Sequence, residues 1–210
     1  MSGTSATGGF VTDRTSSPGA REVEGVLQQM IVATTELAPP LVRPRYQPMP
    51  PARPPADVSW AAVGIIMVEA DDYPYEQHVG IEVLPGETKP GYTIMQRHNT
   101  LTALVTFYGP EAETLSGRLR DALYIGQNME PFAVVNAKMR SVEDLARNPE
   151  VINQQYINRV DMRITLRQQV TRVYPIFDIA AAHVVLQSDT GLVADAPVDP
   201  TFVPRSHTPP

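Results

Sequence analysis

The sequence predicts a mixed α/β (α+β) fold in which a mainly antiparallel β-sheet packs against two main helices. Residues 17–37 and 110–125 carry apolar residues at helical spacing. Residues 100–108, within the run 92–108, and residues 156–170 alternate apolar and polar residues, as strands with one buried face do. Most prolines lie outside these segments, which predicts an extended proline-rich arm and a C-terminal tail beside a folded body.

Proline makes up 21 of the 210 residues, about twice the usual share. Eight prolines fall in residues 39–55, five in the last fourteen residues and only seven between Ser59 and Ser188. This distribution predicts three regions. They are a flexible N-terminal segment over 1–15, an α/β domain over 16–188 that includes an extended arm at 39–57, and an extended or disordered tail over 189–210.

The composition argues against several kinds of site and partner. Cysteine is absent, which excludes disulfides, thiolate metal sites and thiol nucleophiles. The formal net charge of −6 makes the chain a poor candidate for coating nucleic acid. The N-terminal residues lack the basic and apolar regions of a signal peptide, and no stretch approaches the ~20 apolar residues of a membrane helix. We therefore expect no membrane partner.

The first helix is expected over residues 17–37. Ser17 can cap it, and Pro18 suits the first helical position, where a missing N–H costs nothing. Pro39-Pro40 should stop it. Its apolar face is expected to consist of Val23, Leu27, Met30, Ile31 and Thr34.

Residues 39–55 should be extended, because each proline fixes its own φ and restricts the residue before it. This arm carries Arg43, Arg45 and Arg53 and no carboxylate. The three guanidinium groups form either a basic strip that contacts a partner or part of a connector that lies on its own domain.

An apolar, β-branched run at 60–69 is typical of a central strand. Residues 70–91 combine prolines, glycines and acidic residues, which predicts a long loop with at most a short strand at 78–84. Loops of this length in a compact domain are usually functional. The candidate contact residues in it are Asp71, Asp72, Tyr73 and Tyr75.

Residues 92–108 are predicted as one long strand or a strand pair, followed by a helix that Pro110 opens and Gly126 ends. The buried stripe of this helix should be Ala112, Leu115, Leu119, Ala122 and Leu123. A weak strand is expected over 132–140, and the capping-box pattern at 141–144 predicts a short helix that Asn148-Pro149 stops.

The clearest strand pattern covers residues 156–170. Its inward face should be Val160, Met162, Ile164 and Leu166. Arg159, Asp161, Arg163 and Arg167 point the other way, either into solvent or toward a neighbouring subunit, because arginine suits interface ion pairs. Residues 176–187 should form a final strand or helix.

Motifs for catalysis and cofactor binding are missing. The sequence has no phosphate-binding glycine loop and no nucleophile elbow. Its four histidines have no partner at helical spacing, and His98 and His183 could meet only through the fold. We therefore assign no catalytic, cofactor or metal residues, and the absences argue against an enzyme without excluding one.

The order of elements resembles the phage neck or tail terminator family over roughly residues 20–187. A helix and a Pro/Tyr segment precede an apolar strand, a long loop, a strand–helix junction and an alternating strand. Tyr156 stands where that family often has tryptophan. The phrases that carry the resemblance are Arg43-Pro-Arg-Tyr-Gln-Pro48, Val105-Thr-Phe-Tyr-Gly-Pro-Glu-Ala112, Leu119-Arg-Asp-Ala-Leu123, Asn153-Gln-Gln-Tyr-Ile-Asn-Arg159 and Val160-Asp-Met-Arg-Ile-Thr-Leu166.

The resemblance implies a structural virion protein of the tail and neck, assembled in the host cytoplasm. Copies of such proteins, typically six, close into a ring that ends the tail tube and joins it to the connector on the head. The implied partners are the tail tube protein and neck or connector proteins, with the sheath as a further candidate. Genomic DNA would pass through the ring without specific binding, and a mildly acidic lumen would let it slide.

Three other interpretations remain open. The chain could be a head-completion or connector-stopper protein of the neck. It could be a small α/β enzyme or ligand-binding domain, which a pocket joining His98 or His183 to a carboxylate would favour. It could also be a peptide-binding module that uses the proline-rich arm.

Overall fold

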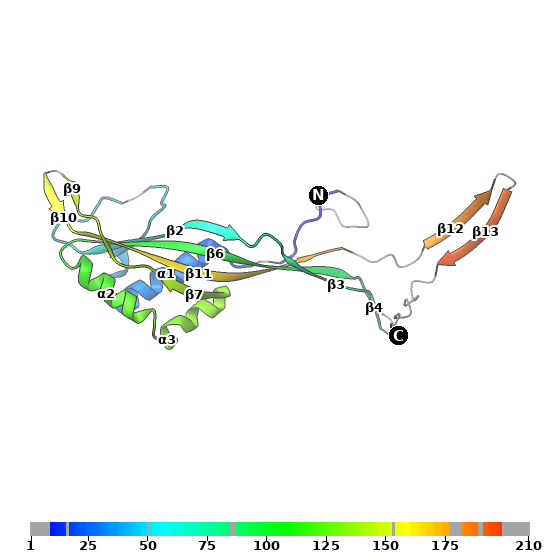
Figure 1. Ribbon diagram of the computed structural model, residues 1–210, viewed down its shortest axis with the longest axis horizontal. Coiled ribbons are helices and arrows are strands. Elements are labelled where there is room, and N and C mark those ends of the chain that lie inside the picture. The colour runs from blue at the N-terminus through cyan, green and yellow to red at the C-terminus, as the bar shows by residue number, and fades with distance from the viewer. Residues whose placement is uncertain are drawn as a thin grey trace, which may run out of the picture. The chain divides into compact units, whose positions relative to one another are not determined.

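The computed structural model (Figure 1) describes residues 9–15, 17–49, 51–84, 87–152, 154–176, 182–188 and 191–198. The chain divides into two compact units, and each is described by itself. The larger unit holds residues 15–75 and 96–172. The smaller unit holds 1–14, 76–95 and 173–210.

A mixed sheet forms the larger unit, with the strand order β1-β2-β6-β11-β7. β1 runs parallel to β2, whereas β2 pairs antiparallel with β6 and β11 pairs antiparallel with β7. The short strand β8 (Ala146–Arg147) adds to β11. The strand bounds are β1 Val42–Pro44, β2 Trp60–Ala70, β6 Tyr92–Tyr108, β7 Ala137–Val142 and β11 Arg159–Tyr174. β6 and β11 extend beyond the residues of this unit.

Helices cover one face of this sheet (Figure 1). The two main ones are α1 (Ala20–Thr35) and α2 (Ala112–Ala122), followed by a short α3 (Gly126–Met129) and the 3₁₀ helix η2 (Glu130–Val135). A second 3₁₀ turn, η1 (Pro39–Leu41), leads into β1. The predicted α/β class with a mainly antiparallel sheet is thus confirmed.

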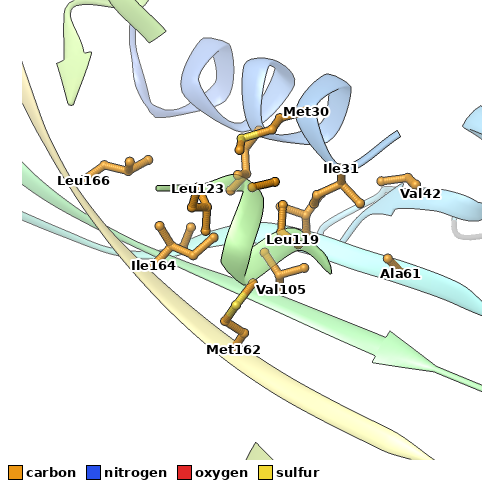
Figure 2. Close-up of a cluster of buried hydrophobic side chains, with 14 of the residues drawn as sticks. Met30, Ile31, Val42, Ala61, Val105, Leu119, Leu123, Met162, Ile164 and Leu166 are labelled. Atoms are coloured by element: carbon orange, nitrogen blue, oxygen red, sulfur yellow. The ribbon is translucent and has the colours of Figure 1, made fainter. Parts of the chain in front are cut away.

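The core lies between the helices and the sheet (Figure 2). Figure 2 shows Leu119 of α2 between Ile31 of α1 and Val105 of β6, with Met30 of α1 and Met162 of β11 in the same cluster. The predicted face of α2, the inward face of β11 and the apolar residues predicted for the face of α1 are buried, but Thr35 is buried there in place of the predicted Thr34. The apolar periodicity of these segments therefore predicted correctly which side chains build the core.

One buried polar side chain joins three segments of this unit. Gln168 of β11 is 1% exposed. Its Nε2 donates to the carbonyl of Pro18, just before α1, at 2.9 Å and to the carbonyl of Val135, at the end of η2, at 3.0 Å. Next to it, the Ser17 hydroxyl donates to the Thr171 carbonyl.

Several short strands complete the chain. β3 (Tyr75–Val79) pairs with β6, and the hairpin β9 (Glu150–Ile152) with β10 (Gln155–Ile157) precedes β11. The smaller unit contains the hairpin of β4 (Glu82–Leu84) with β5 (Glu87–Lys89). It also contains the hairpin of β12 (Ala182–Ser188) with β13 (Gly191–Val198).

The helix ends differ from the prediction by a few residues. α1 begins at Ala20 because Ser17 is bonded to Thr171, and the Glu22 carboxylate accepts the Gly19 amide instead. It ends before the prolines, at Thr35, and the next residue, Glu36, adopts a left-handed φ of 60°. In α2, Pro110 lies in the preceding turn, and Gly126 begins α3 rather than ending α2.

The predicted helix at 141–148 is wrong. Ser141 and Val142 pair with β11, the Glu143 amide donates to the Arg163 carbonyl at 2.9 Å, and residues 146–147 form β8. These ladder bonds take the backbone groups that a capping box would need. The expected strand at 132–140 begins only at Ala137, because residues up to Val135 are 3₁₀.

The expectation of a long loop over 70–91 is wrong where the structure describes this segment, although β3 and β4 overlap the short strand expected at 78–84. β3, β4 and β5 occupy most of the described part of 70–91, and β13 lies in the region taken as tail. Residues 176–187 are expected from the sequence to form a strand or a helix. Residues 182–187 belong to the strand β12. The predicted domain boundaries stay a prediction, and most of the predicted N-terminal segment lies outside the described residues.

Candidate functional site

An aromatic pair at one end of the sheet collects three of the predicted arginines. The rings of Trp60, at the start of β2, and Tyr108, at the end of β6, are stacked. The Arg53 guanidinium lies 5.7 Å from the Trp60 ring centre and 4.9 Å from that of Tyr108. Arg43 lies 5.6 Å from Trp60, and Arg159 lies 5.9 Å from Tyr108. These cation–π contacts hold the proline-rich arm on the sheet.

A carboxylate balances this cluster. Glu150 of β9 accepts hydrogen bonds from Arg53 Nη1 and Nη2, both at 3.3 Å, and from Arg159 Nη1. Arg43 is bound to its own arm, because its Nη1 donates to the Ala52 carbonyl at 2.8 Å. We call the set Arg43, Arg53, Trp60, Tyr108, Glu150 and Arg159 the arm cluster.

A polar network continues the arm cluster across the sheet. Arg159 donates to Asp161 in a bidentate pair, from Nε to Oδ1 at 3.0 Å and from Nη2 to Oδ2 at 2.9 Å. Asp161 also accepts from Thr106 Oγ1 at 2.8 Å and from Asn148 Nδ2 at 2.8 Å. The Arg45 guanidinium in turn donates to Thr106 Oγ1. One carboxylate thus joins β6, β11 and the arm.

This network shifts two pKa values in opposite directions. Burial alone would raise the pKa of Asp161, but the hydrogen bonds from Arg159, Asn148 and Thr106 outweigh burial and lower it. The hydrogen bond to Asp161, against the opposing effect of burial, raises the pKa of Arg159, with Glu150 adding to the effect. Both groups therefore stay charged over the physiological range.

Burial also raises the pKa of Tyr108, although the nearby Arg159, Arg45 and Arg53 oppose this. The phenol is held neutral beneath the arm. Beside it lies an open groove of about 250 Å³, lined by Arg43, Pro44, Arg45, Gln47, Pro51, Arg53, Trp60, Ala62 and Tyr108.

Asp71 and Arg167 form a second, more exposed group. Arg167 Nη2 donates to Asp71 Oδ2 at 3.1 Å, and His98 Nδ1 lies 3.8 Å from the same oxygen. A cavity of about 360 Å³ beside it is lined by His98, Arg167, Lys138 and neighbouring residues of η2 and β7. His98 thus does lie beside a carboxylate, but both side chains are more than 40% exposed, so the site is not a deep pocket.

The other predicted contact residues are not brought together. Arg163 pairs with Glu143 at 3.4 Å, and both are exposed. Asp72, Tyr73 and Tyr75 are exposed at the turn between β2 and β3. His183 lies in β12, and its side chain is outside those that the structure describes.

The sequence reasoning missed the two aromatic residues and Glu150. A signal was present, since the chain's one tryptophan and a tyrosine flank strands that neighbour an arginine-bearing arm. For the arm itself, the contacts shown are those of a connector lying on its own domain. A role for Arg43, Arg45 and Arg53 in binding a partner stays a prediction.

In the described part of the chain, no three His, Cys, Asp or Glu side chains lie close enough together to hold a metal ion. None of the described helices is long and apolar enough to cross a bilayer.

A family whose description is "phage neck terminator protein" matches residues 21–190, a range that holds α1 from its second residue, all of α2 and the whole strand order of the sheet. The chain belongs to the phage neck terminator family. This confirms the resemblance to that family. No curated protein matches the chain. As a neck terminator it is a structural component of the phage tail and neck rather than an enzyme, and tail and neck proteins are its partners.

Proposed function

We propose that copies of this terminator close into a ring at the neck, which ends the tail tube and joins it to the connector of the head. Six copies are the expected number, and genomic DNA passes through the lumen without specific binding. The family match over residues 21–190 carries the proposal. The net charge of −6 supports it physically, because an acidic lumen repels the phosphate backbone and leaves DNA free to slide.

The contact surfaces within the ring include the charged face of β11 and the turn after β2. Arg163 and Arg167 are exposed on β11, and Tyr73 is 90% exposed at the turn. Replacing both arginines, as Arg163→Glu with Arg167→Glu, is expected to weaken assembly. Unchanged assembly of that double variant would remove β11 from the contact.

Electron microscopy tests the function directly. The purified protein is imaged alone, with tail tubes and with head connectors. Rings on tube ends, with six-fold averages, are the expected result. Attachment to the connector alone would instead identify a head-completion or stopper protein, and absence of binding to either would contradict a neck role for the ring.

A further inference from the structure

The sheet of the larger unit has two open edges. β1 pairs with β2 only along residues 61–63, and the Glu24 carboxylate accepts the Ile65 amide at 3.2 Å. From residue 66 to 70, no strand among the described residues pairs with this side of β2. At the opposite end of the strand order, the outer side of β7 likewise has no partner in the described ranges.

The two edges carry opposite charges. Glu69 lies in the open part of β2, and Asp71 and Asp72 follow the end of the strand, whereas Lys138 and Arg140 are exposed on β7. Within the described chain, Glu69, Asp72, Lys138 and Arg140 make no ion pair. We call residues 66–72 the acidic edge and residues 137–142 the basic edge. The acidic edge also exposes apolar side chains, with Met67 at 46% and Val68 at 51%.

The charged residues of the two edges lie at the same level along the strand direction. The Asp71 amide donates to the His98 carbonyl of β6 at 2.9 Å, and the Asp71 carboxylate accepts from Arg167 of β11. Arg167 in turn pairs with Lys138 of β7. A straight path across the sheet therefore leads from the acidic edge to the basic edge.

The strand directions also match. Arg159 lies over Tyr108, which pairs with Trp60, and Arg167 reaches Asp71, so β11 runs in the same direction as β2. β7 is antiparallel to β11 and hence to β2. A second copy moved sideways without being turned over would place its β7 antiparallel to β2, which is a favourable strand pairing.

We infer that the acidic edge of one copy pairs with the basic edge of the next, so that the sheets of neighbouring copies become continuous. This deepens the ring proposed above and rests on it. Pairing of two acidic edges or two basic edges would place like charges opposite each other, which is destabilising. The pairing of unlike edges is heterologous, and repetition of a heterologous contact closes a ring or extends a filament.

Bulges make both edges selective. The pairing of β2 with β6 shifts at Ile66, and that of β7 with β11 shifts at Arg140. Bulges and charges on edge strands discourage indiscriminate pairing with other chains. A complementary edge of opposite charge is the partner that overcomes this barrier.

Crosslinking tests the contact in a chain that has no native cysteine. Glu69→Cys and Ser141→Cys copies are prepared separately, mixed and treated with a short bismaleimide. We expect dimers in the mixture, little product from either variant alone, and a ladder of oligomers from the double variant. Tyr124→Cys, on an exposed residue after α2, replaces Ser141→Cys in the control. Equal yields from the control mixture, or no dimer in the test mixture, would overturn the inference.

Charge reversal gives a second, independent test. Glu69→Lys with Asp72→Lys makes both edges basic, and Lys138→Glu with Arg140→Glu makes both acidic. Each variant alone should lose about tenfold or more of its rings on tail tubes, because like charges then meet. An equimolar mixture should restore rings of alternating copies. Normal rings from either variant alone would overturn the edge pairing but not the proposal that the protein forms a ring. Failure of the native protein to form rings would contradict the proposed function instead.

Discussion

Trp60 and Tyr108 face each other across the ladder of β2 and β6, with ring centres 4.2 Å apart and planes inclined by 11°. Arg53 covers both rings and pairs with Glu150. The stacked pair is therefore the platform on which residues of the proline-rich arm rest, and the position of the arm is tied to the first residue of β2.

Removing Arg53 should loosen the arm. Arg53→Ala deletes two cation–π contacts and the pair with Glu150, which together should lower the free energy of unfolding by about 1 kcal/mol. Because Trp60 is the chain's one tryptophan, its fluorescence reports the arm directly, and we expect a shift to longer wavelength. Arg21→Ala, on the exposed side of α1, is the control. An unshifted Arg53→Ala spectrum would mean that Arg53 does not shield the indole.

The buried phenol should make stability fall at high pH. The pKa of Tyr108 is raised above 10.0 in the folded chain, so the folded state holds this proton more tightly than the unfolded state does. Its contribution is complete below pH 10 and is lost as the pH rises through the folded-state value. Denaturant unfolding should show a steeper alkaline loss for the native chain than for Tyr108→Phe. An equal loss of stability with rising pH in the two chains would refute the raised pKa of Tyr108.

Asp161 should control how the stability of the chain falls at low pH. Its pKa is lowered from 3.8 in the folded chain, so its contribution is present above that value and is lost as the pH falls through the lower folded-state value. Asp161→Asn should cost about 2 kcal/mol at neutral pH, because charge-assisted hydrogen bonds are lost. Its stability should also depend less on pH in the acid range. A double-mutant cycle with Arg159→Gln should give a coupling energy clearly different from zero, and simple additivity would contradict the pairing.

Gly109 should tolerate no side chain. Its φ is +96°, and an added Cβ would come within 2.7 Å of Ser59 Cα and the Val58 carbonyl oxygen. Gly109→Ala is expected to lower the unfolding free energy by about 1–3 kcal/mol. Gly117→Ala is a matched control, since nothing lies within 4 Å of its added Cβ inside α2. Gly117→Ala should stabilise the chain by up to about 1 kcal/mol. The urea midpoints of the two variants and of the native chain measure both effects.

Local periodicity was sufficient for the long elements. The alternation in β11 and the stripe of α2 reflect one buried face each, so burial could be predicted from spacing alone. The same reasoning gave a wrong prediction for residues 141–148. Their capping-box pattern is local, but their hydrogen bonds go to Arg159 and Arg163, and a strand partner that far along the chain leaves no trace in the local pattern.

The candidate site shows the same limit. The arginines of the arm were recognisable as a group, because prolines hold that segment extended. Their actual partners come from elsewhere, since Trp60 and Tyr108 lie 48 residues apart and meet only through the register of β2 with β6. The opposite charges of Glu69 and Lys138 were likewise visible, but their place on opposite edges required the strand order.

The amide of Gln168 has a consequence for synthesis on the ribosome. α1 precedes every strand of this sheet in the chain, yet the residues leading into it are held by Gln168 and Thr171, about 150 positions later. The strand order adds to this delay, because β7 is made before the strand β11 that pairs with it. Contacts of such long sequence separation slow folding. The larger unit is therefore expected to complete its fold only once translation has passed β11, with α1 docking late although it is made before the sheet.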